Sequence, residues 1–163
     1  MTSALVAGRR VWLRLLEPTD APLIRKFYWR LSPDTVYRRF LSPVVPPADR
    51  LVAKLVDVDH HDRDALIGLD EDGIVGIARY GVDSSGSAYE VAVVVADEWQ
   101  GKGLGRLLVR RLAHIARLRG ISSFHATMLG DNSRVHALVR SVTPRATMHY
   151  AGGYVEADIP LRS

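Results

Sequence analysis

The sequence predicts an α/β domain in which helices flank a central mixed, mostly antiparallel sheet. Three observations indicate this fold class. The valine-rich run at 91–95 has the composition of a buried strand. Leucines recur at helical spacing from Leu104 to Leu118. Two apolar runs, at 65–69 and 74–80, flank the segment Asp70-Glu71-Asp72-Gly73, which is typical of a hairpin.

The N-terminal part is expected to hold one strand followed by helices. Thr19 or Asp20 can cap the first helix, since both side chains accept hydrogen bonds from backbone N–H groups. Prolines interrupt the helical pattern in the middle of this part, at Pro43, Pro46 and Pro47. The expected elements are a strand at 11–16, a helix ending near residue 29, and helices at 32–40 and 48–56.

The C-terminal part alternates strands and helices. Gly120 is suited to end the helix that starts at Leu104, because glycine adopts the left-handed conformation of a helix C-cap. Asp131 is expected to cap the last helix, which Pro144 ends. The other expected elements are strands at 88–95 and 122–128, a helix to about residue 142, and a closing hairpin of 146–150 and 154–160.

Composition places the chain among ordinary globular proteins. It has 163 residues, of which 47% are hydrophobic and 25% charged, and this fits one domain with a sizeable core. No apolar run is long enough to predict a transmembrane helix. There is no cysteine, so disulfides, thiolate metal sites and a cysteine nucleophile are excluded. We expect a cytoplasmic protein that needs no metal and does not associate with membranes.

Positive charge is concentrated in one stretch. The net charge is +4, and no acidic residue lies between Trp99 and Gly130. A polyanion is one candidate partner, and most of these arginines can also be a solvated helix face. Nucleic-acid binding is not expected, because the basic run has no interleaved aromatic residues. Part of the charge is explained by a nucleotide-like ligand with phosphate groups.

Gln100-Gly101-Lys102-Gly103-Leu104-Gly105 lies between the valine-rich strand and the leucine-periodic helix. A helix N-terminus offers unpaired N–H groups, and glycines let a phosphate approach them closely. Lys102 is followed by glycine, so the P-loop pattern fails, and the spacing of the three glycines does not fit a dinucleotide fingerprint. The pattern Gln/Arg-x-x-Gly-x-Gly/Ala is met in full.

That pattern is the acetyl-CoA signature of the GNAT acetyltransferase superfamily, which the chain resembles over residues 9–161. We therefore expect one N-acetyltransferase (GNAT) domain over those residues, with the GNAT fold. The chain also resembles the catalytic domain of bacterial Pat-type protein lysine acetyltransferases. Four segments carry this second resemblance: Arg30 to Phe40; Val56 to Asp59 followed by Ala65-Leu66; Val75 to Tyr80 together with Tyr89 to Val95; and Trp99 to Gly105.

The resemblance implies where acetyl-CoA binds. Gln100, Gly101, Lys102, Gly103, Leu104, Gly105 and Arg106 are expected to hold the pyrophosphate. Val93, Val94 and Val95 are expected to pair with the pantetheine arm, and a backbone N–H near Val93 or Val94 to stabilise an oxyanion. Asn132 is expected to contact CoA, or else only to cap its helix. Residues 133–141 lack the tyrosine that many GNAT members use as a general acid.

Glu90 is the candidate general base, because the family's glutamate falls at this position of the strand that enters the CoA site. Strict alternation places it on one face with Ala92 and Val94, which would raise its pKa, although a strand bulge would alter this parity. A solvent-facing glutamate is the alternative. His60 and His61 stand in an acidic loop, which favours a cationic substrate or simple solvation over a metal site.

These features predict an enzyme that transfers acetyl from acetyl-CoA to a protein lysine by direct transfer. Acetylation of a small amine, such as an aminoglycoside, a polyamine or an amino acid, is the first alternative. A non-catalytic acyl-CoA-binding module is the second. A homodimer stays open at this point.

Overall fold

The computed structural model describes residues 1–41 and 48–162, and it contains an eight-stranded sheet in the order β1-β2-β3-β4-β5-β6-β8-β7. The β5–β6 pair is parallel and the other pairs of this sheet are antiparallel, so the predicted mixed, mostly antiparallel α/β fold is confirmed. The strands are β1 (Thr2–Val6), β2 (Arg9–Leu15), β3 (Arg63–Asp70), β4 (Gly73–Val82), β5 (Tyr89–Val95), β6 (Ser123–Leu129), β7 (Thr147–Ala151) and β8 (Tyr154–Pro160).

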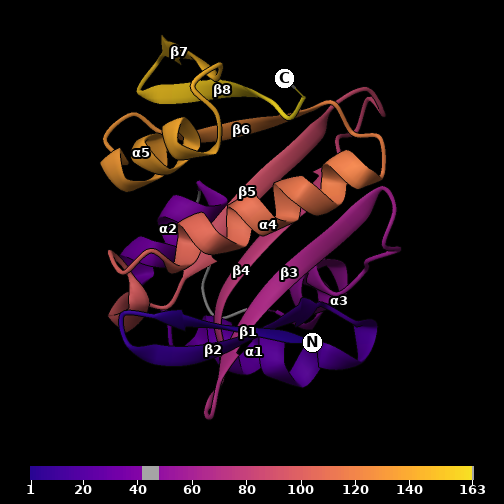
Figure 1. Ribbon diagram of the computed structural model, residues 1–163, viewed down its shortest axis with the longest axis vertical. Coiled ribbons are helices and arrows are strands. Elements are labelled where there is room, and N and C mark those ends of the chain that lie inside the picture. Colours follow the sequence, from indigo (N-terminus) through magenta and orange to yellow (C-terminus); the bar gives the residue numbers. More distant parts are fainter. Residues whose placement is uncertain (42–47, 163) are drawn as a thin grey trace.

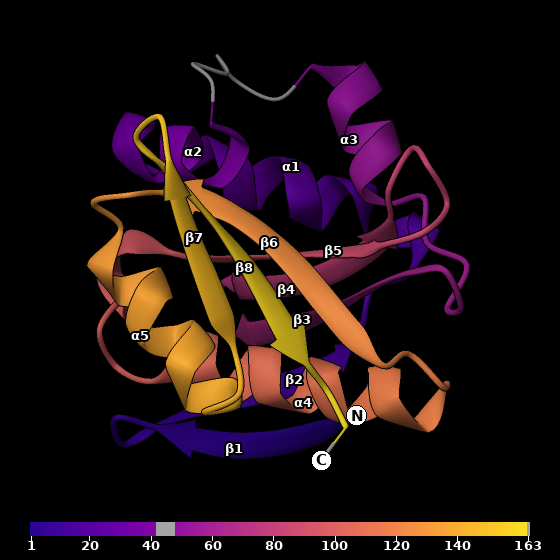
Figure 2. The ribbon, with the colours of Figure 1, turned by 90° about the horizontal axis from the view of Figure 1, so that it is seen from above.

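Helices cover both faces of the sheet. Figure 2 shows α1, α2 and α3 on one face and α4 on the other. In Figure 1, α4 crosses the sheet diagonally and α5 lies beside the β6–β8 end. The helices are α1 (Ala21–Trp29), α2 (Pro33–Phe40), α3 (Asp49–Leu55), α4 (Leu104–Leu118) and α5 (Ser133–Val142), with short 3₁₀ turns at Pro18–Asp20 and Asp97–Trp99. Among residues 1–41 and 48–162, no helix has the length and apolar character needed to cross a bilayer.

The leucine-periodic helix α4 packs closely on the strands beneath it because two glycines leave room. A Cβ built on Gly76 would lie 2.9 Å from Leu108 Cδ1 and 3.1 Å from Leu104 Cδ2. A Cβ built on Gly68, on the neighbouring strand, would lie 3.6 Å from Leu104 Cδ1 and 3.7 Å from Leu108 Cδ2. Leu104 and Leu108 are fully buried, so this contact is part of the core that fixes the start of α4 over the sheet.

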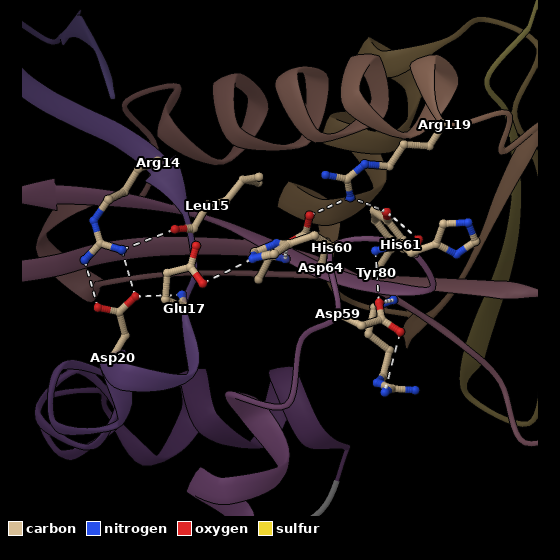
Figure 3. Close-up of polar contacts among 12 residues, drawn as sticks. Arg14, Leu15, Glu17, Asp20, Asp59, His60, His61, Asp64, Tyr80 and Arg119 are labelled. Atoms are coloured by element: carbon tan, nitrogen blue, oxygen red, sulfur yellow. Dashed lines mark hydrogen bonds and ion pairs between the residues drawn. The ribbon is translucent and has the colours of Figure 1, made fainter.

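A charged network ties the C-terminal end of α4 to β4, to the start of β3 and to the residues that follow β2 (Figure 3). Asp64 is fully buried at the start of β3 and accepts a 2.5 Å hydrogen bond from Arg119 Nη1. Arg119 also donates to the Tyr80 hydroxyl at 2.8 Å. His60 Nδ1 lies 2.9 Å from Asp64, and His60 Nε2 lies 3.2 Å from Glu17. The buried carboxylate is therefore paired on two sides.

The structure corrects the predicted elements at a few positions. Strand β1, which the sequence analysis did not predict, pairs with β2 from Thr2↔Leu13 to Val6↔Arg9. The cap of α5 is Asn132 and not Asp131, since Asn132 Oδ1 accepts the hydrogen bond from Val135 N at 3.4 Å. The helix break predicted at Pro43, Pro46 and Pro47 lies outside the described residues.

Candidate functional site

Strands β5 and β6 meet and then separate. Their parallel pairing consists of Glu90↔His125, whereas β5 stays paired with β4 along its whole length, from Gly76↔Val95 to Val82↔Tyr89. The continuous register shows no bulge in the β4–β5 pair, so strict alternation holds for Glu90. Beyond Glu90, the edge of β5 that faces β6 is left without strand partners and is available to another extended chain.

A cavity of about 770 Å³ fills the space between the two strands. Strand β5 and the start of α4 form one wall, and β6 and α5 form the other. Helix α2 borders the same cavity through residues 34, 35, 38 and 39. Of the predicted binding residues, those on the cavity wall are Val93, Val94, Val95, Gln100, Gly101, Gly103, Leu104, Gly105, Arg106 and Asn132.

The glycine turn, at residues 100–105, leads from the 3₁₀ turn after β5 into α4. Gly101 has φ +73° and Gly103 has φ +90°, a backbone conformation in which a side chain would be strained. Gly103 is the N-cap of the 15-residue helix α4, and Arg106 lies in its first turn. The first N–H groups of the helix and one guanidinium therefore stand at this end of the cavity, which suits a phosphate group.

Gln100 has a bracing role that the sequence analysis did not foresee. Its amide nitrogen donates to Val95 O at 3.0 Å and to Thr35 Oγ1 at 3.1 Å. Its amide oxygen accepts from Arg134 Nη1 at 2.6 Å. Gln100 thus joins the glycine turn to β5, to α2 and to α5, and it fixes the geometry of the turn.

Helix α2 is fastened to the glycine turn and to the loop before α5. Asp97 accepts hydrogen bonds from the Ser32 backbone N–H at 2.8 Å and from the Ser32 hydroxyl at 3.0 Å. Burial alone would raise the pKa of Asp97, but these bonds and one from Thr35 lower it overall. On the other side, Arg38 donates to Asp131 at 3.1 Å. These contacts hold α2 over the cavity from both sides.

Glu90 stands where β5 and β6 meet, one residue before the cavity wall begins at Val91. Its side chain is 46% exposed, and Oε1 lies 3.8 Å from His125 Nε2. Partial burial raises the pKa of Glu90, the charge of His125 acts in the opposite direction, and Asp83 and Glu156 add to the rise. The expected direction of the shift is therefore present, although the side chain is also in contact with solvent.

Comparisons with known proteins show to which family this chain belongs. The model of the acetyltransferase (GNAT) family matches residues 24–142. The chain belongs to this family. It is 37% identical to acetyltransferase PA5475 of Pseudomonas aeruginosa over 135 residues, which are 80% of this chain and 73% of that protein. It is 30% identical to acetyltransferase Pat of Mycolicibacterium smegmatis over 137 residues, which are 81% of this chain and 40% of Pat.

Solved structures agree with this assignment to the GNAT family. The GNAT domain of S. lividans PAT superposes with a TM-score of 0.88 and 24% identity, covering 98% of this chain and 96% of that domain. A cAMP-binding acyltransferase from Mycobacterium smegmatis matches with a TM-score of 0.65 and 25% identity, covering 98% of this chain and 47% of that protein. The chain thus spans less than half the length of that acyltransferase and of Pat. The predicted fold, family and enzyme class, an acetyltransferase, are confirmed.

Two predicted site residues of this GNAT chain lie outside the cavity wall. Glu90 adjoins the wall, as described above. Lys102 points away from it, and its ammonium donates to Glu98 O at 2.6 Å. Conversely, Arg134 and the hydroxyl residues Thr35, Thr127, Ser133 and Ser141 line the wall without having been predicted. These residues reach the cavity because β5 and β6 separate there, and no local sequence pattern predicts that separation.

Helix α5 contains no tyrosine, so it presents no tyrosine general acid to the cavity. His136, the histidine of that helix, does not line the cavity and packs its ring 6.1 Å from that of Tyr150. Its Nε2 is buried and has no hydrogen-bond partner among the described residues. His136 is therefore placed as a packing residue of α5 on β7.

The acidic loop after α3 uses its polar groups within the fold. Asp59 accepts hydrogen bonds from the backbone N–H groups of His61 and Arg63, both at 2.9 Å. His61 Nδ1 lies 3.1 Å from Asp62, and His60 belongs to the network around Asp64. Within residues 1–41 and 48–162, no group of three or more His, Cys, Asp or Glu side chains is arranged to hold a metal ion.

Proposed function

We propose that the protein acetylates the side-chain amine of a protein lysine, with acetyl-CoA as donor and Glu90 as general base. One observation carries the proposal. The cavity between β5 and β6 begins at a glycine turn suited to a pyrophosphate and ends beside a carboxylate whose pKa is raised. A donor that lies along β5 would bring its thioester to the end where an amine can meet Glu90.

The residues of the cavity suit the parts of acetyl-CoA. The N–H groups at Gly101 to Arg106 suit the pyrophosphate, and the Arg106 guanidinium adds a positive charge at the same end of the cavity. The edge of β5 at Val93 to Val95, which has no strand partner on the side of β6, suits the amide groups of pantetheine. Asn132 uses its side-chain oxygen as a helix cap, which leaves its amide N–H groups for the ligand. Acetyl-CoA supplies the activated acyl group.

Glu90 would take a proton from the acceptor ammonium, and the free amine would then attack the thioester carbonyl. A backbone N–H of Val93 or Val94 would donate to the oxygen on which negative charge develops. The C–N bond forms and the C–S bond breaks, and the leaving CoA thiolate takes up the proton that the nitrogen loses, so the products are the amide and CoA. A base with a raised pKa is closer in basicity to the amine and is the better proton acceptor near neutral pH.

The acceptor class rests on the resemblance to Pat-type enzymes and on local charge. Asp83 and Glu156 are close enough to Glu90 to raise its pKa, and Asp158 lies on the same strand as Glu156. This negative surrounding favours an ammonium group as the approaching substrate. Cytoplasmic location and a homodimer stay predictions.

The test is thiol release from acetyl-CoA by the purified protein, against a panel of lysine-containing proteins and small amines. Glu90→Gln should lower turnover by about 10²-fold or more and leave acetyl-CoA binding intact. Glu71→Gln, on the exposed β3–β4 turn, is the matched control and should retain activity. Release with small amines alone would replace the acceptor class. Acetyl-CoA binding without release for any acceptor would favour a non-catalytic module.

A further inference from the structure

Three titratable side chains stand in a row across three neighbouring strands. Glu90 on β5 is paired with His125 on β6, and His125 is paired with Asp158 on β8. Directly paired residues of adjacent strands lie side by side on one face of a sheet. His125 Nε2 is 3.8 Å from Glu90 Oε1, and His125 Nδ1 is 3.1 Å from Asp158 Oδ1. One ring thus faces a carboxylate at each of its nitrogens.

This row adjoins the end of the cavity that lies opposite the glycine turn. The pairing of β5 with β6 consists of Glu90↔His125, so His125 is the residue of β6 that stands opposite Glu90 before the strands separate. Its side chain is 25% exposed, which leaves little freedom for the ring to turn away. The hydrogen bond that His125 Nδ1–H donates to Asp158 fixes the ring plane and directs Nε2 toward Glu90.

His125 differs in the sign of its charge from the carboxylates that act on Glu90. Among the described residues, the groups that act on Glu90 are Asp83 after β4, His125 on β6 and Glu156 on β8. The two carboxylates disfavour ionised Glu90, and His125 is the group that favours it. Burial alone would lower the pKa of His125, but Asp158, Glu90 and Glu156 raise it overall.

We propose that His125, held by Asp158, is a positioning residue that keeps the Glu90 carboxylate ionised and turned toward the acceptor nitrogen. The inference rests on the proposed role of Glu90 as base. The imidazolium offsets the charges of Asp83 and Glu156. Glu90 is therefore ionised when the acceptor binds, and it can accept a proton from the ammonium. Asp158 acts through His125, since it both orients the ring and favours its charged form.

The first test needs no acceptor. The ¹³C carboxyl signal of Glu90, assigned by its loss in Glu90→Gln, is titrated in the wild type and in variants. His125→Gln should raise the pKa of Glu90, because the favourable charge is gone while burial, Asp83 and Glu156 remain. His125→Lys should cancel most of that rise, since it restores a positive charge. Asp158→Asn should give a smaller rise, and His114→Gln, on the exposed face of α4, should give none.

The second test separates positioning from folding. In the pH profile of kcat/KM, His125→Gln should move the acidic limb to higher pH and lose activity by about threefold or more at pH 6. The variant should approach the wild type at high pH, where His125 of the wild type has lost its charge and the glutamine of the variant has none. A merely structural role would lower activity equally at all pH values, or leave the titration of Glu90 unchanged, and either result would overturn the inference.

The two proposals fail in different ways. Undiminished turnover in Glu90→Gln removes the base assignment, whatever the carboxyl titration shows. Loss of turnover in Glu90→Gln with an unmoved Glu90 titration in His125→Gln leaves the base and removes His125. If His125→Gln does not fold, Asp158→Asn and His125→Lys carry the same comparison.

Discussion

At the scale of single residues, the buried carboxylate of Asp64 predicts a measurable effect on stability. It is fully buried and is bonded to Arg119, at the end of α4, and to His60, in the loop before β3. Asp64→Asn would remove the negative charge and leave the guanidinium of Arg119 without a carboxylate partner. We expect a loss of about 3 kcal/mol in the free energy of unfolding, measured by urea denaturation. Asp49→Asn, whose carboxylate is 94% exposed, should change it by less than about 1 kcal/mol. Equal effects would contradict the assignment.

The same network predicts a pH dependence with a definite sign. The hydrogen bond with Asp64 raises the pKa of His60, burial acts against it, and Glu17 adds to the rise. A raised folded-state pKa means that protonation stabilises the fold below the unfolded value of about 6.5 and that this gain is lost as pH rises through the folded value. His60→Gln should therefore cost more stability at pH 5.5 than at pH 9. A cost independent of pH would show that the charge of His60 has no part in it.

At the scale of elements, the packing of α4 on β4 is the contact to test. Gly76→Ala would place a methyl group 2.9 Å from Leu108 Cδ1, and the buried leucines have little room to move. Overpacking should lower the free energy of unfolding by about 1–2 kcal/mol. Gly81→Ala, in the same strand, meets its nearest atom at 3.5 Å and should be neutral or slightly stabilising. Chemical denaturation of both variants checks this, and a neutral Gly76→Ala would mean that α4 can shift outward.

Elements with a strong local signal could be predicted from the sequence, and relations between elements could not. The valine run, the leucine periodicity and the Asp-Gly turn have local physical causes, and each produced the expected element. Strand β1 was missed because Thr2–Val6 is short and mixes polar with apolar residues, so its partner β2 decides its conformation. His125 was missed for a similar reason, since only strand pairing brings it to Glu90.

At the scale of the whole molecule, the fold joins two layers of helices through one sheet that opens in its middle. The antiparallel part from β1 to β5 and the part made of β6, β8 and β7 meet at Glu90↔His125 and then separate around the cavity. Bonds from Gln100, Asp97 and Arg38 fasten α2 and α5 across this opening. The central claim is that acetyl-CoA binds in this opening, and its failure would remove both proposals.

Calorimetric titration of acetyl-CoA tests that claim most directly. Thr127 is exposed on β6 and lines the cavity, so Thr127→Trp fills the opening with little change to the core. Thr147→Trp, on the exposed strand β7, is the matched control. We predict one acetyl-CoA per chain in the wild type and in Thr147→Trp, and a loss of about tenfold or more in affinity in Thr127→Trp, about 1.4 kcal/mol. Wild-type affinity in a folded Thr127→Trp would contradict the account.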